Sequence, residues 1–224
     1  MKSTNFDQLS RLLYKNCIIK SIYDIGENKV ALTKKYSEFI PKADFFMFEA
    51  SPSMIKPNLS YDWFNIVLSD KDKKEVIFHE INGTGDSYYE EKTSFYSGRQ
   101  KRHKLLTRTL DSVIYEYKLP WPDIIKIDTQ GSEVDIFKGG HNALQSCKLL
   151  LTEAPIIEYN KGAPKLHEYI DILRKYSLIP VRIEEIHIID NTLIQIDIVF
   201  LKKELKDKLF GGGSFINQNL ISPI

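Results

Sequence analysis

Cysteine is scarce in this 224-residue chain, which has only Cys17 and Cys147, far apart in the sequence. Two distant cysteines make neither a disulfide framework nor a zinc motif, and they suit a reducing compartment. Residues 1–16 lack the apolar core of a signal peptide, and no apolar run approaches the roughly 18 residues of a membrane span. The formal net charge of +1 gives no overall basic field for a nucleic acid. We therefore expect a cytoplasmic protein with no membrane span and no nucleic-acid partner.

The chain also lacks the GxGxxG motif of dinucleotide-binding proteins, which argues against a cradle for a pyrophosphate. It has a single glycine, Gly26, at the end of an expected strand at residues 21–26. A helix that Asn28 can cap should follow, and then a nearly continuous apolar strand at residues 43–50 that reaches Glu49. Strand, glycine turn, helix and strand with an acid at its tip form the first half of a nucleotide-binding βαβ unit.

Residues 123–140 are the most informative stretch, because an apolar run there ends at Asp128 and a polar turn follows. Ser132 and Asp135 have the spacing of a capping box, which predicts that a helix begins there, and two glycines end it. The unit is therefore strand, turn and helix. Ligands of open α/β sheets bind at the carboxyl ends of the strands, where Asp128 and Gln130 are expected to stand.

The remaining patterns predict further elements and one long polar segment. Strands are expected at residues 64–70, 75–80, 148–154, 178–189 and 193–202, and helices at 6–14, 109–117 and 164–176. Asn191 suits the turn of a closing hairpin. Residues 81–104 carry aromatic side chains, among them Tyr88 and Tyr89, that suit a rim stacking on a sugar, although an unstructured loop is the alternative. The basic run at 99–104 is either a solvated loop or an anion contact.

The length and composition fit one α/β domain, because 42% of the residues are hydrophobic and 27% are charged. Residues 1–20 are expected to form an N-terminal helix packed on the domain, with a lid over the site as the alternative. Residues 21–203 form the domain, with 81–104 as a loop on the substrate side. Residues 204–224 are predicted to be a flexible tail. The sequence does not indicate an oligomeric state.

Four blocks in this order resemble class I, Rossmann-like S-adenosylmethionine-dependent methyltransferases, and more narrowly the FkbM-type family. They are Tyr23-Asp-Ile-Gly-x-Asn28, Phe48-Glu-Ala-Ser-Pro52, Leu68-Ser-Asp70, and Ile125-Lys-Ile-Asp-x-Gln-Gly-x-Glu133 with Phe137-Lys-Gly-Gly140. The resemblance covers roughly residues 21–202. It implies an α/β fold with a mostly parallel seven-stranded sheet, a C-terminal antiparallel hairpin, and helices on both faces.

The resemblance also implies a cofactor, S-adenosylmethionine, and the residues that hold it. These are Asp24, Gly26, Asn28, Glu49, Ala50, Ser69, Asp70 and Asp128. Within this set Glu49 would take the ribose hydroxyls, and Asp128 would stand near the methyl donor and the acceptor. Family members typically methylate hydroxyl oxygens, often on sugars or other small metabolites.

Transfer to an alcohol requires alignment of the acceptor and removal of its proton. The candidate catalytic residues are Asp128, Glu153 and His79, with His103 as a further base from the loop side. A structural role is the alternative for Glu153 and His79. The expected substrate contacts are Gln130, Tyr88, Tyr89 and His103. No His, Asp and Glu spacing marks a metal site, although carboxylates gathered at strand ends could hold Mg²⁺.

Two residues depart from the family pattern, namely Val30 in place of a second glycine and Glu27 in place of an alanine. They motivate the alternative of a non-catalytic module that has lost cofactor binding. Another Rossmann-type enzyme that uses a nicotinamide cofactor is a weaker alternative. An N-methyltransferase is a variant of the leading interpretation, and it would keep much of its rate after Asp128→Asn.

Overall fold

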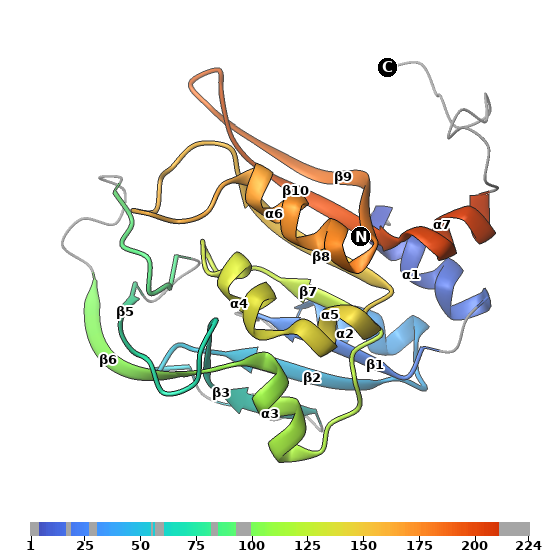
Figure 1. The fold of residues 1–224 in the computed structure, drawn as a ribbon, viewed down its shortest axis with the longest axis horizontal. Helices are drawn as coiled ribbons and strands as arrows, with labels where there is room; N and C mark the ends of the chain where they lie inside the picture. Colours follow the sequence, from blue (N-terminus) through green and yellow to red (C-terminus); the bar gives the residue numbers. More distant parts are fainter. Residues whose placement is uncertain are drawn as a thin grey trace.

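The structure is a computed structural model that describes residues 5–16, 19–26, 31–54, 56, 61–81, 85–92 and 100–210. One seven-stranded sheet forms the centre of the molecule, with strand order β3-β2-β1-β7-β8-β10-β9 (Figure 1). Its strands are β1 (Ser21–Ile25), β2 (Asp44–Glu49), β3 (Asp62–Asn65), β7 (Ile124–Ile127), β8 (Leu149–Pro155), β9 (Leu178–Ile189) and β10 (Thr192–Lys202). Strand β10 is antiparallel to β8 and β9, and the other neighbouring pairs are parallel. The predicted fold class is confirmed.

The closing hairpin forms as its sequence predicts. Asp190 and Asn191 connect β9 to β10, and both have positive φ angles, 48° and 61°. A two-residue turn with both φ angles positive matches the twist of the flanking strands, and Asp and Asn tolerate this conformation better than most residues.

A second, three-stranded sheet lies beside the main one, with order β4-β6-β5. Its strands are β4 (Val67–Leu68), β5 (Glu75–Glu80) and β6 (Lys101–Arg108). The single strand expected at 64–70 is therefore wrong, because β3 pairs in the main sheet and β4 turns into the small one. The solvated loop expected at 99–104 is also wrong from Lys101 on, because these basic residues pair with β5. Residues 82–84 and 93–99 of the long polar segment lie outside the described residues.

Helices cover both faces of the main sheet. They are α1 (Asn5–Asn16), α2 (Ala31–Phe39), α3 (Leu110–Tyr117), α4 (Glu133–Gly139), α5 (His141–Ser146), α6 (Leu166–Leu173) with a 3-10 turn at Arg174–Tyr176, and α7 (Lys203–Phe210). One core joins the sheet to α3, α4, α5 and α6, and a second joins it to α1, α2 and α7. The flexible tail predicted from residue 204 is wrong as far as residue 210, because Leu205 packs in the second core. None of the described helices has the length and apolar character needed to cross a membrane.

Helix α1 packs at the amino ends of the central strands. Phe6 and Leu13 share a core with Ile22, Ile124 and Leu149, which stand at or near the first residues of β1, β7 and β8. In Figure 1 the helix lies at the right beside α7, whereas β5 and β6 lie at the left. The predicted packing on the domain is observed, and this position gives no support to a lid over the carboxyl ends of the strands.

Candidate functional site

A cleft opens at the carboxyl ends of β1, β2 and β7, where the βαβ pattern places a ligand. The space in the cleft, with the solvent at its open mouth included, is about 680 Å³. Gly26, Glu49 and Asp128 border it at the strand ends, and Leu68 and Tyr88 border it from the side of the small sheet. The two sheets therefore build one cleft between them.

Gly26 allows the turn after β1 to pass close to the end of β7. Its φ angle is +81°, and a Cβ atom added there would lie 1.8 Å from the carbonyl oxygen of Asp128. Its amide donates a hydrogen bond to the carbonyl of Phe48, at 2.8 Å. A side chain at this position would push apart the two strand ends that form the floor of the cleft.

Glu49 stands at the end of β2 with 7% of its surface exposed, and it borders the cleft beside Ala50. Its Oε1 accepts a hydrogen bond from the amide of Ser51, at 2.7 Å. Burial raises the pKa of the Glu49 carboxyl above its ordinary value. A buried carboxylate that borders a cleft is a strong acceptor for hydroxyl groups of a ligand.

Glu80, at the end of β5, anchors the loop that carries Ser51. Its Oε1 accepts hydrogen bonds from the Ser51 hydroxyl at 2.6 Å and the Ser53 amide at 2.9 Å, and its Oε2 lies 2.9 Å from His103 Nε2. Burial alone would raise the pKa of Glu80, but the hydrogen bonds from Ser51, Ser53 and His103 outweigh it and lower the pKa to about 2. His103 thus binds Glu80 and does not border the cleft.

Ser69 and Asp70 follow Leu68 but lie behind the wall that this leucine forms. The hydroxyl of Ser69 is 3.1 Å from Asp70 Oδ1 and 3.1 Å from the Tyr88 hydroxyl. Asp70 also accepts a hydrogen bond from Lys74, at 3.2 Å. Burial would raise the pKa of Asp70, but the bond and charge of Lys74 outweigh it and lower the pKa. A bound ligand would meet Leu68 first, and Ser69 would contribute through Tyr88.

Two adjacent tyrosines bind the first turn of α4. The hydroxyls of Tyr88 and Tyr89 both donate to Asp135 Oδ2, at 3.0 and 2.8 Å. This contact overturns the predicted capping box, because Asp135 turns to the tyrosines and the Ser132 hydroxyl donates instead to the carbonyl of Thr129, at 3.3 Å. Tyr88 borders the cleft, and Tyr89 supports it from behind.

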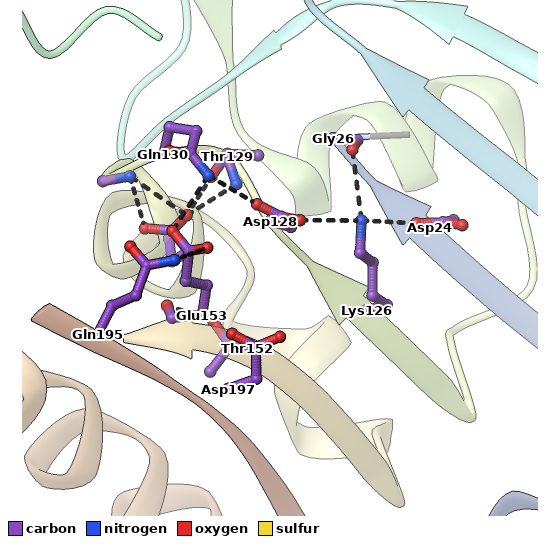
Figure 2. Close-up of polar contacts among 12 residues, drawn as sticks. Asp24, Gly26, Lys126, Asp128, Thr129, Gln130, Thr152, Glu153, Gln195 and Asp197 are labelled. Atoms are coloured by element: carbon purple, nitrogen blue, oxygen red, sulfur yellow. Dashed lines mark hydrogen bonds and ion pairs between the residues drawn. The ribbon is translucent and has the colours of Figure 1, made fainter. Parts of the chain in front are cut away.

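Lys126 links the ends of β1 and β7 (Figure 2). Its Nζ lies 3.5 Å from Asp24 Oδ1 and 3.6 Å from Asp128 Oδ2, and it donates to the carbonyl of Gly26 at 3.3 Å. The side chain of Asp24 is 1% exposed and that of Asp128 is 41% exposed. Lys126 therefore offsets the negative charge of the buried Asp24, while the carboxylate of Asp128 stays accessible from the cleft. No role for Lys126 was predicted from the sequence, although it lies within one of the four family blocks, because its contact with Asp24 depends on the pairing of β1 with β7.

Gln130 connects Asp128 to Glu153, as Figure 2 shows. Its Nε2 donates to Asp128 Oδ1 and to Glu153 Oε1, both at 3.1 Å. Glu153 also accepts hydrogen bonds from the Tyr159 hydroxyl at 2.9 Å and from Gln195 Nε2 at 2.5 Å. Burial, with the charge of Asp128 next in weight, raises the pKa of Glu153 well above its ordinary value. The structure thus brings together three of the predicted residues and adds Tyr159 and Gln195.

The turn that carries Gln130 is fixed by Glu133, which is buried. Glu133 accepts hydrogen bonds from the amides of Thr129 at 2.7 Å and Gly131 at 3.0 Å, and from the Tyr169 hydroxyl at 2.6 Å. Gln130 has a φ angle of +54°, an uncommon conformation for this residue type. Glu133 therefore holds the backbone in the shape that directs Gln130 toward the two acids.

His79 lies apart from this cluster. It is 6% exposed on β5, where its amide donates to the Ser87 carbonyl at 2.7 Å. Its neighbour Phe78 borders the cleft and His79 does not, because successive strand side chains point to opposite faces. This placement favours the structural alternative for His79. Asn28, Glu27 and Val30 lie outside the described residues.

Strands β8, β9 and β10 bring together a further group that the sequence did not mark. Glu153, His187 and Asp197 each present a potential metal ligand, and these ligand atoms all lie within 4.8 Å of one another. The side chains come from three neighbouring strands, so their spacing in the sequence carries no recognisable metal motif.

Comparisons with known proteins identify the family of the chain. Residues 24–178 match the family model described as the methyltransferase FkbM domain. The 2-O-methyltransferase NoeI of Sinorhizobium fredii (strain NBRC 101917 / NGR234) is 28% identical over 179 residues, with coverage of 70% of this chain and 72% of that protein.

Solved methyltransferase structures are more distant. Precorrin-6y C5,15-methyltransferase of Geobacter metallireducens GS-15 has a TM-score of 0.44 at 13% identity, covering 88% of this chain and 87% of that one. The N-methyltransferase NodS of Bradyrhizobium japonicum WM9 has a TM-score of 0.43 at 13% identity, covering 88% and 93%. Because the family model matches well over half of the chain, the protein belongs to the FkbM family of S-adenosylmethionine-dependent methyltransferases.

Proposed function

We propose that the protein transfers a methyl group from S-adenosylmethionine to a hydroxyl oxygen of a small molecule, with sugars as the first class of acceptor. The observation that carries this proposal is the Asp128 carboxylate at the edge of the cleft, which Gln130 joins to a second acid, Glu153. An alcohol must lose a proton when its oxygen is methylated, and a carboxylate can accept that proton. The name of the relative NoeI, a 2-O-methyltransferase, supports the same choice.

The residues present fit the cofactor. Gly26 leaves the strand ends free of a side chain, and the Glu49 carboxylate borders the cleft where it can accept hydrogen bonds from two ribose hydroxyls. The cofactor supplies a methyl group on a positively charged sulfur. Asp24 and Asp128, on either side of Lys126, would line its methionine end. Ala50 would complete the side of the cleft next to the small sheet, and Ser69 and Asp70 would act from behind Leu68, through Tyr88.

Asp128 is the first candidate for the general base. It borders the cleft with a side chain that is 41% exposed, so an acceptor hydroxyl can reach it. Glu153 is enclosed by Gln130, Tyr159 and Gln195, which suits a residue that orients Gln130 better than one that meets the acceptor. Gln130 in turn fixes one oxygen of Asp128. The protein would then act mainly by aligning the acceptor and holding its proton.

Titration calorimetry with S-adenosylmethionine and S-adenosylhomocysteine tests the cofactor assignment. We expect micromolar binding by the unmodified chain and its loss in Glu49→Ala. The matched control is Glu75→Ala, a 60% exposed acid of the small sheet, which should bind normally. If the folded protein bound neither compound, the non-catalytic alternative that Glu27 and Val30 motivate would be correct. Binding of a nicotinamide cofactor instead would select the other Rossmann-type alternative.

Methyl transfer to a panel of sugars, other alcohols and amines tests the reaction itself. Asp128→Asn should lower kcat for a hydroxyl acceptor by about 10²–10⁴-fold, a larger effect than the weakening of cofactor binding that its place at the methionine end implies. Turnover of amines alone, with much of the rate kept in Asp128→Asn, would replace the proposal with N-methylation.

A further inference from the structure

Three side chains with metal-binding chemistry converge on one face of the main sheet, beyond Gln130. In the register of the sheet, Asp197 of β10 stands opposite Glu153 of β8, and Gln195 stands opposite His187 of β9. Residues two apart on a strand point to the same face, so Gln195 and Asp197 direct their side chains together toward this group. Figure 2 shows Gln195 and Asp197 on either side of Glu153.

The hydrogen-bonding capacity of this group is incompletely used. Asp197 Oδ1 is shielded from solvent and accepts no hydrogen bond from the described residues. His187 Nε2 lies 3.7 Å from this oxygen, too far for a hydrogen bond, and that nitrogen also lies 3.9 Å from Glu185. A shielded carboxylate oxygen without a donor is costly unless a cation binds it.

Acidic side chains outnumber basic ones around this group. Asp197 stands opposite Glu153 in the register of the sheet, and Glu185 lies 3.9 Å from His187 Nε2. One imidazole thus lies among three carboxyl groups, an arrangement that a bound cation would stabilise.

We propose that Glu153, Asp197 and His187 bind one divalent transition-metal ion. Two carboxylates and one imidazole, with room for water, are a donor set that suits Mn²⁺ or Zn²⁺ better than Ca²⁺. Metal–ligand bonds of about 2.0–2.2 Å place the donor atoms about 3 Å from one another. The three ligand atoms now lie within 4.8 Å of one another, so the side chains must move closer together to bind an ion. His187 is 36% exposed near the end of the hairpin and can turn inward at little cost.

The site adjoins the acceptor side of the cleft. Glu153 shares Gln130 with Asp128, so an ion there would lie next to the position proposed for the acceptor. Any part that the ion plays in holding acceptor oxygens rests on the function proposed above. Binding of the ion itself does not, and it can be measured without cofactor or acceptor.

The test is a titration of tag-free, EDTA-treated protein with Mn²⁺, in which electron paramagnetic resonance reports the free ion. We expect one Mn²⁺ per chain and at least about tenfold weaker binding in Asp197→Asn and in His187→Gln. Asp190→Asn is the control, because it removes an exposed carboxylate of the same hairpin and should bind Mn²⁺ as the unmodified chain does.

A second readout identifies the ligand. The chain has five histidines, and bound Mn²⁺ should selectively broaden one imidazole resonance in the NMR spectrum, the one that disappears in His187→Gln. Circular dichroism checks that each variant is folded. If Asp197→Asn does not fold, the Mn²⁺ affinity of His187→Gln alone tests the proposal. Absence of Mn²⁺ binding, equal affinity in all variants, or broadening centred on another histidine would overturn the proposal.

Discussion

At Gly26 a single methyl group should disturb two strand ends at once. The Cβ of Gly26→Ala would meet the carbonyl of Asp128 at 1.8 Å, so β1 and β7 must separate at the floor of the cleft. We expect a loss of stability clearly larger than the about 1–2 kcal/mol that a positive φ angle alone costs an alanine. Cofactor affinity should fall with it. Urea unfolding and titration calorimetry measure the two effects.

Gly162 provides the matched control for this prediction. Its φ angle of +76° is close to the +81° of Gly26, but no atom lies within 4 Å of the Cβ position. Gly162→Ala therefore has the energetic cost of an alanine with a positive φ angle but no steric clash of its Cβ atom. It should leave cofactor binding unchanged. Equal losses of stability in the two variants would show that conformation alone, and not the approach of β7, requires glycine at position 26.

Among the elements, β5 determines the position of the loop after β2 through the carboxylate of Glu80. The pKa of this group is lowered from an ordinary 4.5 to about 2, so the charged form is favoured in the folded state. A group with a depressed folded pKa contributes stability above its ordinary pKa and loses the contribution as the pH falls toward the folded value. Glu80→Gln should therefore lower the free energy of unfolding at pH 7 by on the order of 3 kcal/mol.

The pH dependence distinguishes this effect from a simple loss of packing. The difference between Glu80→Gln and the unmodified protein should shrink steadily between about pH 4.5 and pH 2, as chemical denaturation at each pH would show. Glu75→Gln on the same strand is the control, because its ion pair with Lys104 is largely exposed and contributes little. A difference that stayed constant with pH would assign the effect to shape and not to charge.

Local sequence patterns predicted helices and strands well where one face of the element is buried. They predicted poorly where a strand forms only because a partner strand, distant in the sequence, pairs with it. The helix α3 was predicted from its apolar face, and the structure adds a cap in which Thr109 accepts a hydrogen bond from the Ser112 amide at 3.2 Å. The basic strand β6 could not be predicted, because its lysines and arginines reflect an exposed face and its partner β5 is fixed only in the folded chain.

For the whole molecule, the order of strands and helices predicted the sheet and the edge where ligands bind. It predicted Asp128 and Gln130 at that edge and named Glu153 as a further candidate, because each follows or ends a central strand. The partners Tyr159, Gln195 and Asp197 could not be predicted in the same way. They reach Glu153 from a following loop and from an antiparallel strand, and the register that aligns them depends on the packing of the whole hairpin.

The separation between the two ends of the sheet gives a prediction about α1. Leu13 is fully buried against the amino ends of the strands, on the side away from the cleft. Leu13→Ala should lower the free energy of unfolding by about 2–5 kcal/mol, because it removes methyl groups and leaves a cavity. The Kd of S-adenosylmethionine should stay the same at a temperature where the variant is folded. Lys15→Ala, on the exposed face of α1, should change neither quantity. If cofactor affinity fell in Leu13→Ala without a loss of stability, α1 would be acting on the cleft after all, as a lid would.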